Sequence, residues 1–329
     1  MSVLERDGQN HRFSNEQLNR SVMNLCQKEG VNWSVPFQLY LDAAVRIRFA
    51  LPMAISIDNL LHTHRNDKLM IRMGKLAIAT TILEKEAHSY LCPEEPRKRE
   101  GVDVAVTNTE RIAKSWYLPL MRLLVTGRTL EELERIFENV AFVVFNYDRC
   151  LEHFLVNAVI NYFNVDPRTA IATVNRITIL HPYGQVGHFA WQEGARDSVT
   201  SSFGNAEGKL IEIADQLLTF TESAEEGVVI QTRALVAGAE TLVFMGFGFL
   251  PQNMELLTVA NPAATKRVFL TTKGIGDDDV EIVINELRHV LQRKPTSERA
   301  GRDNRFQAFV ERGTCRELMD HHWLRLTRA

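Results

Sequence analysis

The chain has 329 residues, 45% of them hydrophobic and 24% charged, with a formal net charge of −3, as is usual for a globular protein. This composition gives no overall basic field for binding nucleic acid, and no apolar run reaches the roughly 18 residues that a membrane span requires. The four cysteines are scattered and form no CxxC pair, so neither a disulfide framework nor a zinc site of the usual spacing is expected. We therefore expect a cytoplasmic protein without a metal centre.

The first 138 residues are predicted to be mostly helical. Residues 1–12 are polar and are expected to form a loosely held lead-in, after which Ser14 begins a helix as its N-cap. The longest predicted helix spans 66–90, where apolar residues recur at intervals of three and four. A polar, proline-bearing stretch at 93–107 is expected to be a surface loop.

From residue 139 the pattern changes to strands that alternate with helices. Apolar runs predict strands at 140–145, 177–180, 241–245 and 268–271. Helices are predicted at 149–161, 166–174, 205–219, 224–238 and 277–291, followed by a charged loop at 293–305 and a short helical tail. The run 140–145 has no polar alternation, so we expect both faces of that strand to be covered. The fold class is therefore α/β: a Rossmann-like parallel sheet covered by helices at 139–329, forming one compact unit with the helical region at 1–138.

Candidate chemistry follows the first of these strands, at the carboxyl end where open α/β sheets bind ligands. The segment reads Asn146-Tyr147-Asp148-Arg149. Asn146 offers a donor and acceptors that suit a ribose hydroxyl or a positioned water, and Asp148 can accept from a hydroxyl or an amide. An equally good interpretation needs no ligand: Asp148 caps the next helix, and Arg149 pairs with Glu152 three residues on.

Two further segments follow strands in the same way. His181 could act as a general base near neutral pH, and Tyr183 and Gly184 follow it in the same loop, after Pro182. A loop histidine bonded to a neighbouring carbonyl explains His181 equally well. The third segment, 245–253, contains two glycines that would let backbone amides approach a phosphate or ribose. Its GxG is not completed to GxGxxG, because position 251 is proline, and a tight turn without ligand remains an equal alternative.

In their order, the segments FNYDRCLE, LHPYGQVG and FMGFGFLPQN resemble the bacterial sirtuin-like NAD-binding proteins over residues of about 50 to 275. The resemblance implies NAD as ligand or substrate and chemistry at the bond between nicotinamide and ribose. It implies that Asn146 and Asp148 hold the nicotinamide ribose and carboxamide. It also implies a contact near the ligand from the Tyr-Gly turn of Gly184. The remaining implied cofactor-binding residues, towards the adenosine half, are Gly246, Phe247, Gly248 and Asn253.

Two departures from the family pattern bear on activity. The Gly-Ala-Gly-x-Ser turn that cradles the pyrophosphate does not occur before residue 50, so the chain is expected to begin beyond it. Tyr183 stands where active members have a histidine directly before the glycine, and His181 lies two residues earlier. A phenol with a pKa of about 10 is a poor base at neutral pH. We therefore expect a nucleotide-binding protein in which catalysis by Asn146, His181 and Tyr183 is weakened or lost.

Three alternatives stay open. The chain could be an active NAD hydrolase that serves antiviral defence by depleting NAD. It could be a non-catalytic scaffold that contacts a protein partner or a second copy through its helical region. It could also be an enzyme on another nucleotide, with His181 as base. A zinc-dependent deacylase is disfavoured because the zinc module is missing, and neither a nucleic-acid nor a membrane partner is expected.

Overall fold

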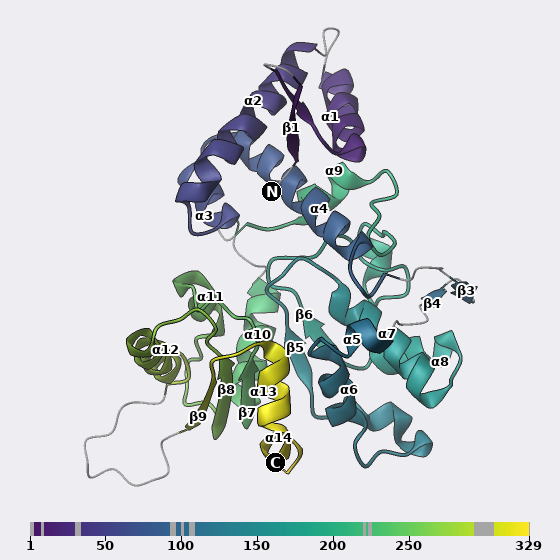
Figure 1. The fold of residues 1–329 in the computed structure, drawn as a ribbon, viewed down its shortest axis with the longest axis vertical. Helices are drawn as coiled ribbons and strands as arrows, with labels where there is room; N and C mark the ends of the chain where they lie inside the picture. The colour runs from purple at the N-terminus through teal and green to yellow at the C-terminus, as the bar shows by residue number, and fades with distance from the viewer. Residues whose placement is uncertain are drawn as a thin grey trace. The chain divides into compact units, whose positions relative to one another are not determined.

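The computed structural model shows a mixed α/β protein (Figure 1). It describes residues 3–7, 10–29, 34–92, 97–99, 102–104, 109–219, 222, 226–292 and 306–328. The chain divides into two compact units, and each is assembled from three separate segments. The first unit comprises Met1–Ala105, Asn146–His153 and Tyr183–Ala224. The second unit comprises Val106–Phe145, Phe154–Pro182 and Glu225–Ala329.

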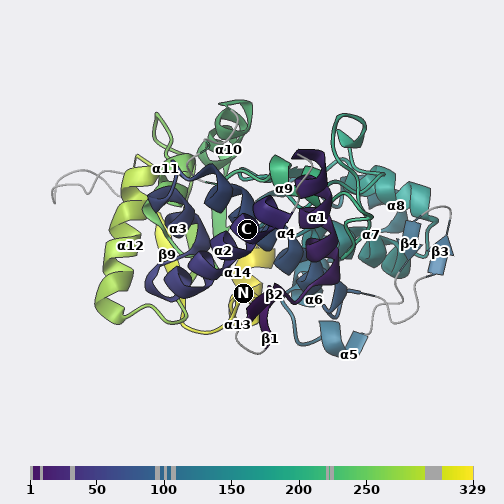
Figure 2. The same ribbon diagram turned by 90° about the horizontal axis from the view of Figure 1, so that it is seen from above.

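The first unit is built mainly from helices. They are α1 (Glu16–Glu29), α2 (Ser34–Ala50), η1 (Leu51–Met53), α3 (Ile57–Thr63), α4 (Lys68–Ala87), η3 (Ala195–Asp197) and α9 (Leu210–Gln216). Asp67 is the N-cap of helix α4, and its side chain accepts a hydrogen bond from the Met70 amide and so satisfies a free N–H of the first turn. It packs against α2 and α9 (Figure 2). Its apolar face is buried in the core of the unit, which confirms the long helix predicted over 66–90.

Two short antiparallel hairpins in this unit contradict the sequence predictions. Strands β1 (Leu4–Asp7) and β2 (Asn10–Phe13) pair where a loose lead-in was expected. Val3, Leu4 and Phe13 are buried in the core of the unit, and this apolar burial holds the hairpin in place. Strands β3 (Arg97–Arg99) and β4 (Val102–Val104) pair inside the expected surface loop.

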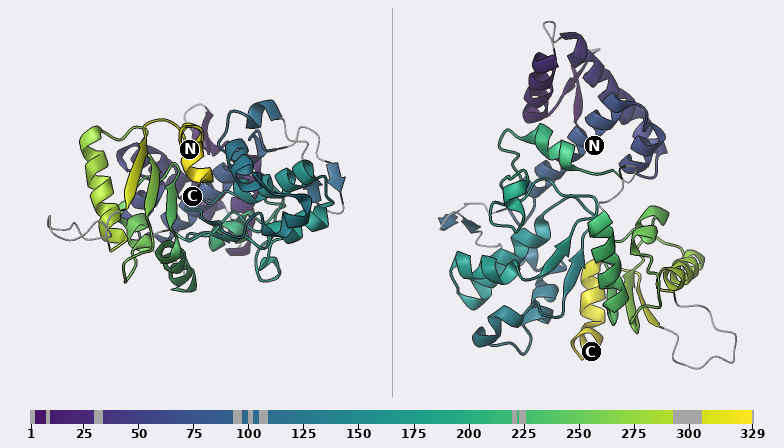
Figure 3. Two further views of the ribbon diagram at one scale, coloured as in Figure 1. Left: turned by 90° about the horizontal axis from the view of Figure 1, so that it is seen from below. Right: turned by 180° about the vertical axis from the view of Figure 1, so that it is seen from behind.

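Among the described residues, the parallel strands lie in the second unit, in two small sheets (Figure 3). Strand β5 (Ala141–Val143) pairs with β6 (Thr178–Leu180). Strand β8 (Arg267–Thr271) lies between β7 (Thr241–Phe244) and β9 (Gln307–Glu311). The helices that connect or cover these strands are α5 (Thr109–Ile112), α6 (Tyr117–Val125), η2 (Leu130–Arg135), α7 (Cys150–Phe163), α8 (Pro167–Val174), α10 (Glu226–Gly238), α11 (Pro251–Leu257), α12 (Asp277–Val290), α13 (Cys315–His321) and α14 (Trp323–Thr327). Helix α7 starts in the first unit and continues into the second.

The most deeply buried strand is β8, not β5. Val268, Phe269 and Leu270 are each 0% exposed, because β8 is paired along both edges and lies in the core of the unit. In β5 the side chain of Ala141 is exposed and the next two are only partly buried, so the expectation of a strand covered on both faces is wrong.

The carboxyl-terminal region also differs from its prediction. Strand β9 was not predicted, whereas the helix predicted at 277–291 is confirmed by α12 and the short helical tail by α13 and α14. The predicted charged loop at 293–305 lies outside the described residues. Across the described ranges, no helix is both long and apolar enough to cross a bilayer.

Candidate functional site

The predicted site residues are divided between the two units. Asn146, Asp148, Tyr183 and Gly184 belong to the first unit. The members in the second unit are His181, Gly246, Phe247, Gly248 and Asn253.

The turn of residues 146–149 alternates between exposed and buried side chains. Tyr147 and Arg149 are buried, whereas Asn146 is exposed and Asp148 is half-buried. The Asp148 Oδ1 atom accepts a hydrogen bond of 3.1 Å from the amide of Cys150, the first residue of α7. The expected capping role of Asp148 is therefore confirmed. Tyr147 and Arg149 therefore anchor the turn, and the polar side chains nearer the surface are those of Asn146 and Asp148.

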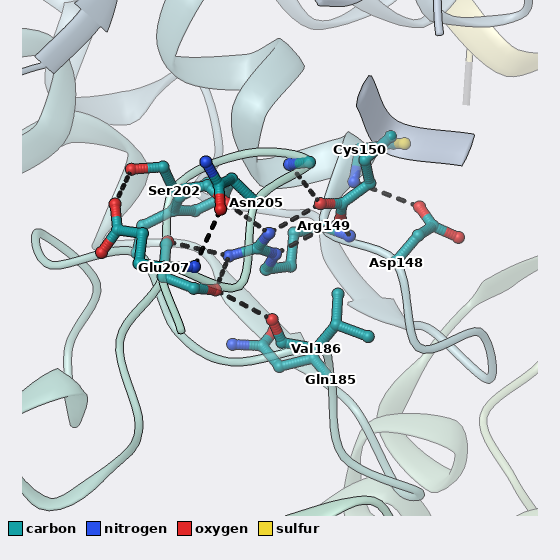
Figure 4. Close-up of polar contacts among 12 residues, drawn as sticks. Asp148, Arg149, Cys150, Gln185, Val186, Ser202, Asn205 and Glu207 are labelled. Carbon is teal, nitrogen blue, oxygen red and sulfur yellow. Dashed lines mark hydrogen bonds and ion pairs between the residues drawn. The ribbon is translucent and has the colours of Figure 1, made fainter. Parts of the chain in front are cut away.

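Arg149 anchors the turn through a buried ion pair with Glu86, at the end of α4. Figure 4 shows Arg149 among the side chains of the turn and of the loop that contains Ser202. The Nη2 atom lies 2.6 Å from Glu86 Oε2, and both side chains are 0% exposed. The expected pairing of Arg149 with Glu152 is wrong. That geometry assumes two exposed positions on one helix, but Arg149 precedes α7 and points into the first unit.

The same guanidinium also binds the loop that follows the second candidate segment. Its Nη1 atom donates to the carbonyl oxygen and the Oγ of Ser201, at 3.0 and 2.9 Å, and Nη2 donates to the Ser202 carbonyl at 2.9 Å. Its Cζ atom lies 4.5 Å from the centroid of the Phe189 ring, a cation–π contact. One side chain thus joins a helix, a turn and a loop.

The first two candidate segments are joined directly within the first unit. The Val186 amide donates to the Tyr147 carbonyl oxygen at 2.9 Å. The Ser201 hydroxyl, which accepts from Arg149, donates to the Val186 carbonyl at 3.1 Å. The loop of Tyr183 and Gly184 therefore lies beside the turn of Asn146 and Asp148.

The Tyr147 hydroxyl lies between two oxygen atoms, Asp58 Oδ1 at 3.1 Å and the Leu218 carbonyl at 2.9 Å. Burial raises the pKa of the Tyr147 phenol, and the Asp58 carboxylate raises it further. Burial also raises the pKa of Asp58, partly offset by the hydrogen bond from Tyr147. A phenol has a single proton to donate, so both contacts are hydrogen bonds only when Asp58 is protonated and donates to Tyr147.

The Tyr183–Gly184 turn is shaped by its backbone. The Tyr183 carbonyl accepts a hydrogen bond from the Leu218 amide at 2.9 Å. The half-buried side chain of Tyr183 packs against the core of the first unit. Gly184 has φ of +81°, and a Cβ there would lie 3.0 Å from the Gln216 carbonyl oxygen. Glycine is thus required by conformation and by space. His181 directly follows β6 and is half-buried in the second unit.

The glycine segment after β7 forms an aromatic turn in the second unit. Gly246 has φ of +62°, and its amide donates to Thr271 Oγ1 at 2.8 Å. The Phe247 ring meets that of Phe145 edge-on, with centroids 5.0 Å apart, so the ends of β5 and β7 lie together. Gly248 is exposed, and Asn253 lies in the first turn of α11.

Sequence reasoning missed the residues that hold these segments, chiefly Glu86, Ser201, Asp58 and Thr271. A signal for Glu86 existed: it continues the three-residue spacing of buried Thr80 and Leu83 along α4, which places a carboxylate on the apolar face. A carboxylate is rarely buried unless it is paired. The pattern could have indicated a buried basic partner.

The described residues contain no group of three or more His, Cys, Asp or Glu side chains that could hold a metal ion. Of the nine predicted positions, the structure brings Asn146, Asp148, Tyr183 and Gly184 together in the first unit.

Comparisons of the chain with models of protein families, with curated proteins and with solved structures found no match.

Proposed function

We propose that the chain binds NAD or a related nucleotide at the carboxyl ends of its parallel strands, as a Rossmann-like relative of the sirtuin-like NAD hydrolases. The observation that carries the proposal is the Phe145–Phe247 contact, since it brings the ends of β5 and β7 together within the second unit. Asn146 is the residue directly after Phe145. Polar or glycine-rich turns at the carboxyl ends of parallel strands are where open α/β sheets bind ligands.

The exposed groups support this choice of ligand. Asn146 is exposed and Asp148 half-buried on an anchored turn. An amide and a carboxylate are groups that suit the hydroxyls of a ribose and a carboxamide. At the other turn the Gly246 amide already donates to Thr271. Phe247, Gly248 and Asn253, in the same segment of the second unit, are the residues that the resemblance implies for the adenosine half.

Catalysis is proposed to be weakened or lost. Tyr183 occupies the position of the expected base, and its side chain packs against an apolar core. A phenol is protonated at neutral pH and accepts a proton poorly. His181 lies in the other unit and directly follows β6, two positions before Tyr183. Binding with slow or absent release of nicotinamide is the expected behaviour.

Titration calorimetry with NAD, with released nicotinamide measured by chromatography on the same samples, tests both parts. We expect NAD to bind without appreciable nicotinamide release. Asn146→Ala should weaken binding at least about tenfold, equivalent to about 1.4 kcal/mol. Asn285→Ala, an exposed asparagine on α12, is the matched control and should bind as the wild type does.

The two parts of the proposal fail in different ways. Absence of binding at millimolar NAD would exclude the nucleotide function. Nicotinamide release that Asn146→Ala abolishes would instead show an active hydrolase and overturn the claim of weakened catalysis.

A second candidate function, contact with a protein partner or a second copy through the helical region, is favoured by one surface feature. Phe49, Met53 and Ile55, at and after the end of α2, are 60%, 84% and 80% exposed. Exposed apolar clusters are typical of interaction sites. Light scattering of the wild type and of Met53→Ser/Ile55→Ser tests it: a loss of mass in the double variant, with NAD binding retained, would support this role.

A further inference from the structure

We infer that the buried Glu86–Arg149 ion pair positions Asn146 and Asp148 for the ligand, so that the end of α4 helps to set the affinity for the nicotinamide half of NAD. This inference rests on the proposed function. It assigns Glu86 and Arg149 as positioning residues, because neither is available to touch the ligand. The polar atoms of both side chains are already hydrogen-bonded within the protein.

The guanidinium of Arg149 has no donor left for a ligand. Its five N–H groups are matched by five acceptor contacts: Nε and Nη2 to Glu86, Nη1 to two oxygens of Ser201, and Nη2 to the Ser202 carbonyl. The side chain is completely buried. An arginine in a nucleotide site would ordinarily be considered as a phosphate ligand, and this geometry excludes that role for Arg149.

Glu86 fixes the backbone as well as the side chain. Its Oε1 atom accepts from the backbone amide of Arg149 at 2.8 Å, and its Oε2 atom accepts from the Gly204 amide at 2.9 Å. The peptide unit directly after Asp148 is therefore held by a carboxylate of α4. Because that carboxylate is buried, its hydrogen bonds do not compete with water.

The other side of the turn is fixed independently. The Tyr147 carbonyl accepts from the Val186 amide, and the Tyr147 hydroxyl contacts Asp58 and the Leu218 carbonyl. Asp148 thus lies between two anchored residues, and Asn146 precedes the first of them. A small displacement of the anchors would move both polar side chains, and misplacement of positioning groups lowers ligand affinity without removing any ligand contact.

The pairing with Ser201 extends the effect to the second loop. The Ser201 hydroxyl accepts from Arg149 and donates to the Val186 carbonyl, so the guanidinium holds the turn of Asn146 and the loop after Gly184 in one arrangement. A lysine keeps the charge but has neither the planar fork nor the number of donors. Arg149→Lys should therefore loosen the two loops together.

The test compares two ligands, NAD and AMP, by titration calorimetry. AMP lacks the nicotinamide half, so its binding reports only on the residues proposed for the adenosine half. We expect Arg149→Lys to weaken NAD binding at least tenfold while AMP binding changes less than twofold. Ser201→Ala, which removes a single hydroxyl, should weaken NAD binding about threefold with AMP binding unchanged.

Leu25→Ala is the matched control for lost stability. Leu25 is buried in the core of the first unit, on α1, so its truncation destabilises the unit while leaving the polar network in place. The ratio of NAD affinity to AMP affinity should stay at the wild-type value in this variant, although its thermal midpoint falls. A purely structural role for Arg149 predicts the same unchanged ratio in Arg149→Lys.

The possible outcomes distinguish failure of the positioning role of Glu86 and Arg149 from failure of the proposed NAD binding. If the wild type binds neither ligand, the proposed function fails, and the inference falls with it. If the wild type binds NAD but the affinity ratio is unchanged in Arg149→Lys and Ser201→Ala, the positioning role is refuted while the function stands. If Arg149→Lys does not fold, Ser201→Ala decides alone, because a changed ratio supports the role and an unchanged one overturns it.

Discussion

The Val186 amide donates a 2.9 Å hydrogen bond to the carbonyl oxygen of Tyr147, and this bond joins two loops that are distant in sequence. The sequence predicts both loops as candidate sites from the chemistry of their side chains. Their association depends instead on backbone groups and on one buried arginine. The positions of Asn146 and Asp148 near the surface therefore depend on the buried hydrogen bonds of the residues next to them.

Removing the charge of Glu86 should destabilise the first unit strongly. Glu86→Gln leaves Arg149 buried without its counter-ion, and breaking a buried pair costs about 3–5 kcal/mol. Urea unfolding at pH 7 measures the loss. Glu16→Gln is the control, since the Glu16–Arg20 pair is exposed and such pairs contribute less than about 1 kcal/mol. Equal losses in the two variants would contradict the buried network.

Two glycines of the first unit separate backbone strain from lack of space. Gly194 has φ of +81° with no heavy atom within 4 Å of the place that a Cβ would take, so Gly194→Ala should cost about 1–2 kcal/mol, the usual left-handed penalty. Gly204 has φ of +70°, but its Cβ would lie 2.6 Å from the backbone of Ala87. Gly204→Ala must displace the end of α4, so its loss of unfolding free energy should be clearly larger. Similar losses in urea titrations would exclude this close approach.

His153 should make the protein less stable as pH falls. Burial, with a smaller effect of the nearby Arg149 charge, lowers the pKa of His153 to about 4, although a hydrogen bond to the Leu91 carbonyl opposes the shift. The unfolded chain takes up the proton first, near pH 6.5. The stabilisation is therefore complete above pH 6.5 and is lost between about pH 6.5 and 4, up to about 3 kcal/mol.

Urea unfolding at pH 7.5 and pH 5 checks this behaviour. The difference in unfolding free energy between the wild type and His153→Gln should shrink at the lower pH, because the glutamine does not titrate. A difference that is the same at both pH values would show that His153 keeps its ordinary pKa in the folded protein.

Asp58 should behave in the opposite sense. Its folded pKa is raised by burial, so its contribution is present at low pH and is lost as pH rises through that pKa. Asp58→Asn should therefore not lower the unfolding free energy at pH 7, because the amide is neutral and can donate to the Tyr147 oxygen. Tyr147→Phe removes the hydroxyl and should cost about 1–2 kcal/mol in the same urea titration. Equal losses in both variants would contradict the raised pKa.

Much of the strand and helix order was predictable from residue patterns. The apolar runs located β6, β7 and β8 to within about one residue, because unbroken runs bounded by polar or glycine residues are typical of strands in α/β proteins. Strand β9 was missed because Gln307–Glu311 is short and mixed, and its order comes from pairing with a strand far away in sequence.

The candidate site was predictable only in part. The turns of Asn146, Gly184 and Gly246 were correctly predicted to follow strands, because strand ends and glycines have local signatures. The partner of Arg149 was not predicted, because Glu152, three residues on, is not the carboxylate that the fold brings to it. Ion pairs between segments that are distant in sequence depend on tertiary packing, and the spacing of residues along one helix does not reveal them.

The interleaving of the two units has a consequence for the order in which they are made. All three segments of the first unit precede residue 225, so a growing polypeptide can close the Glu86–Arg149 pair before the last third of the chain has left the ribosome. The second unit cannot be completed that early. Its strands β5 and β6 are synthesised well before β7, β8 and β9, which form its buried sheet. Its early segments emerge with apolar side chains uncovered. Co-translational folding of this protein should therefore be sequential, with the helical unit first.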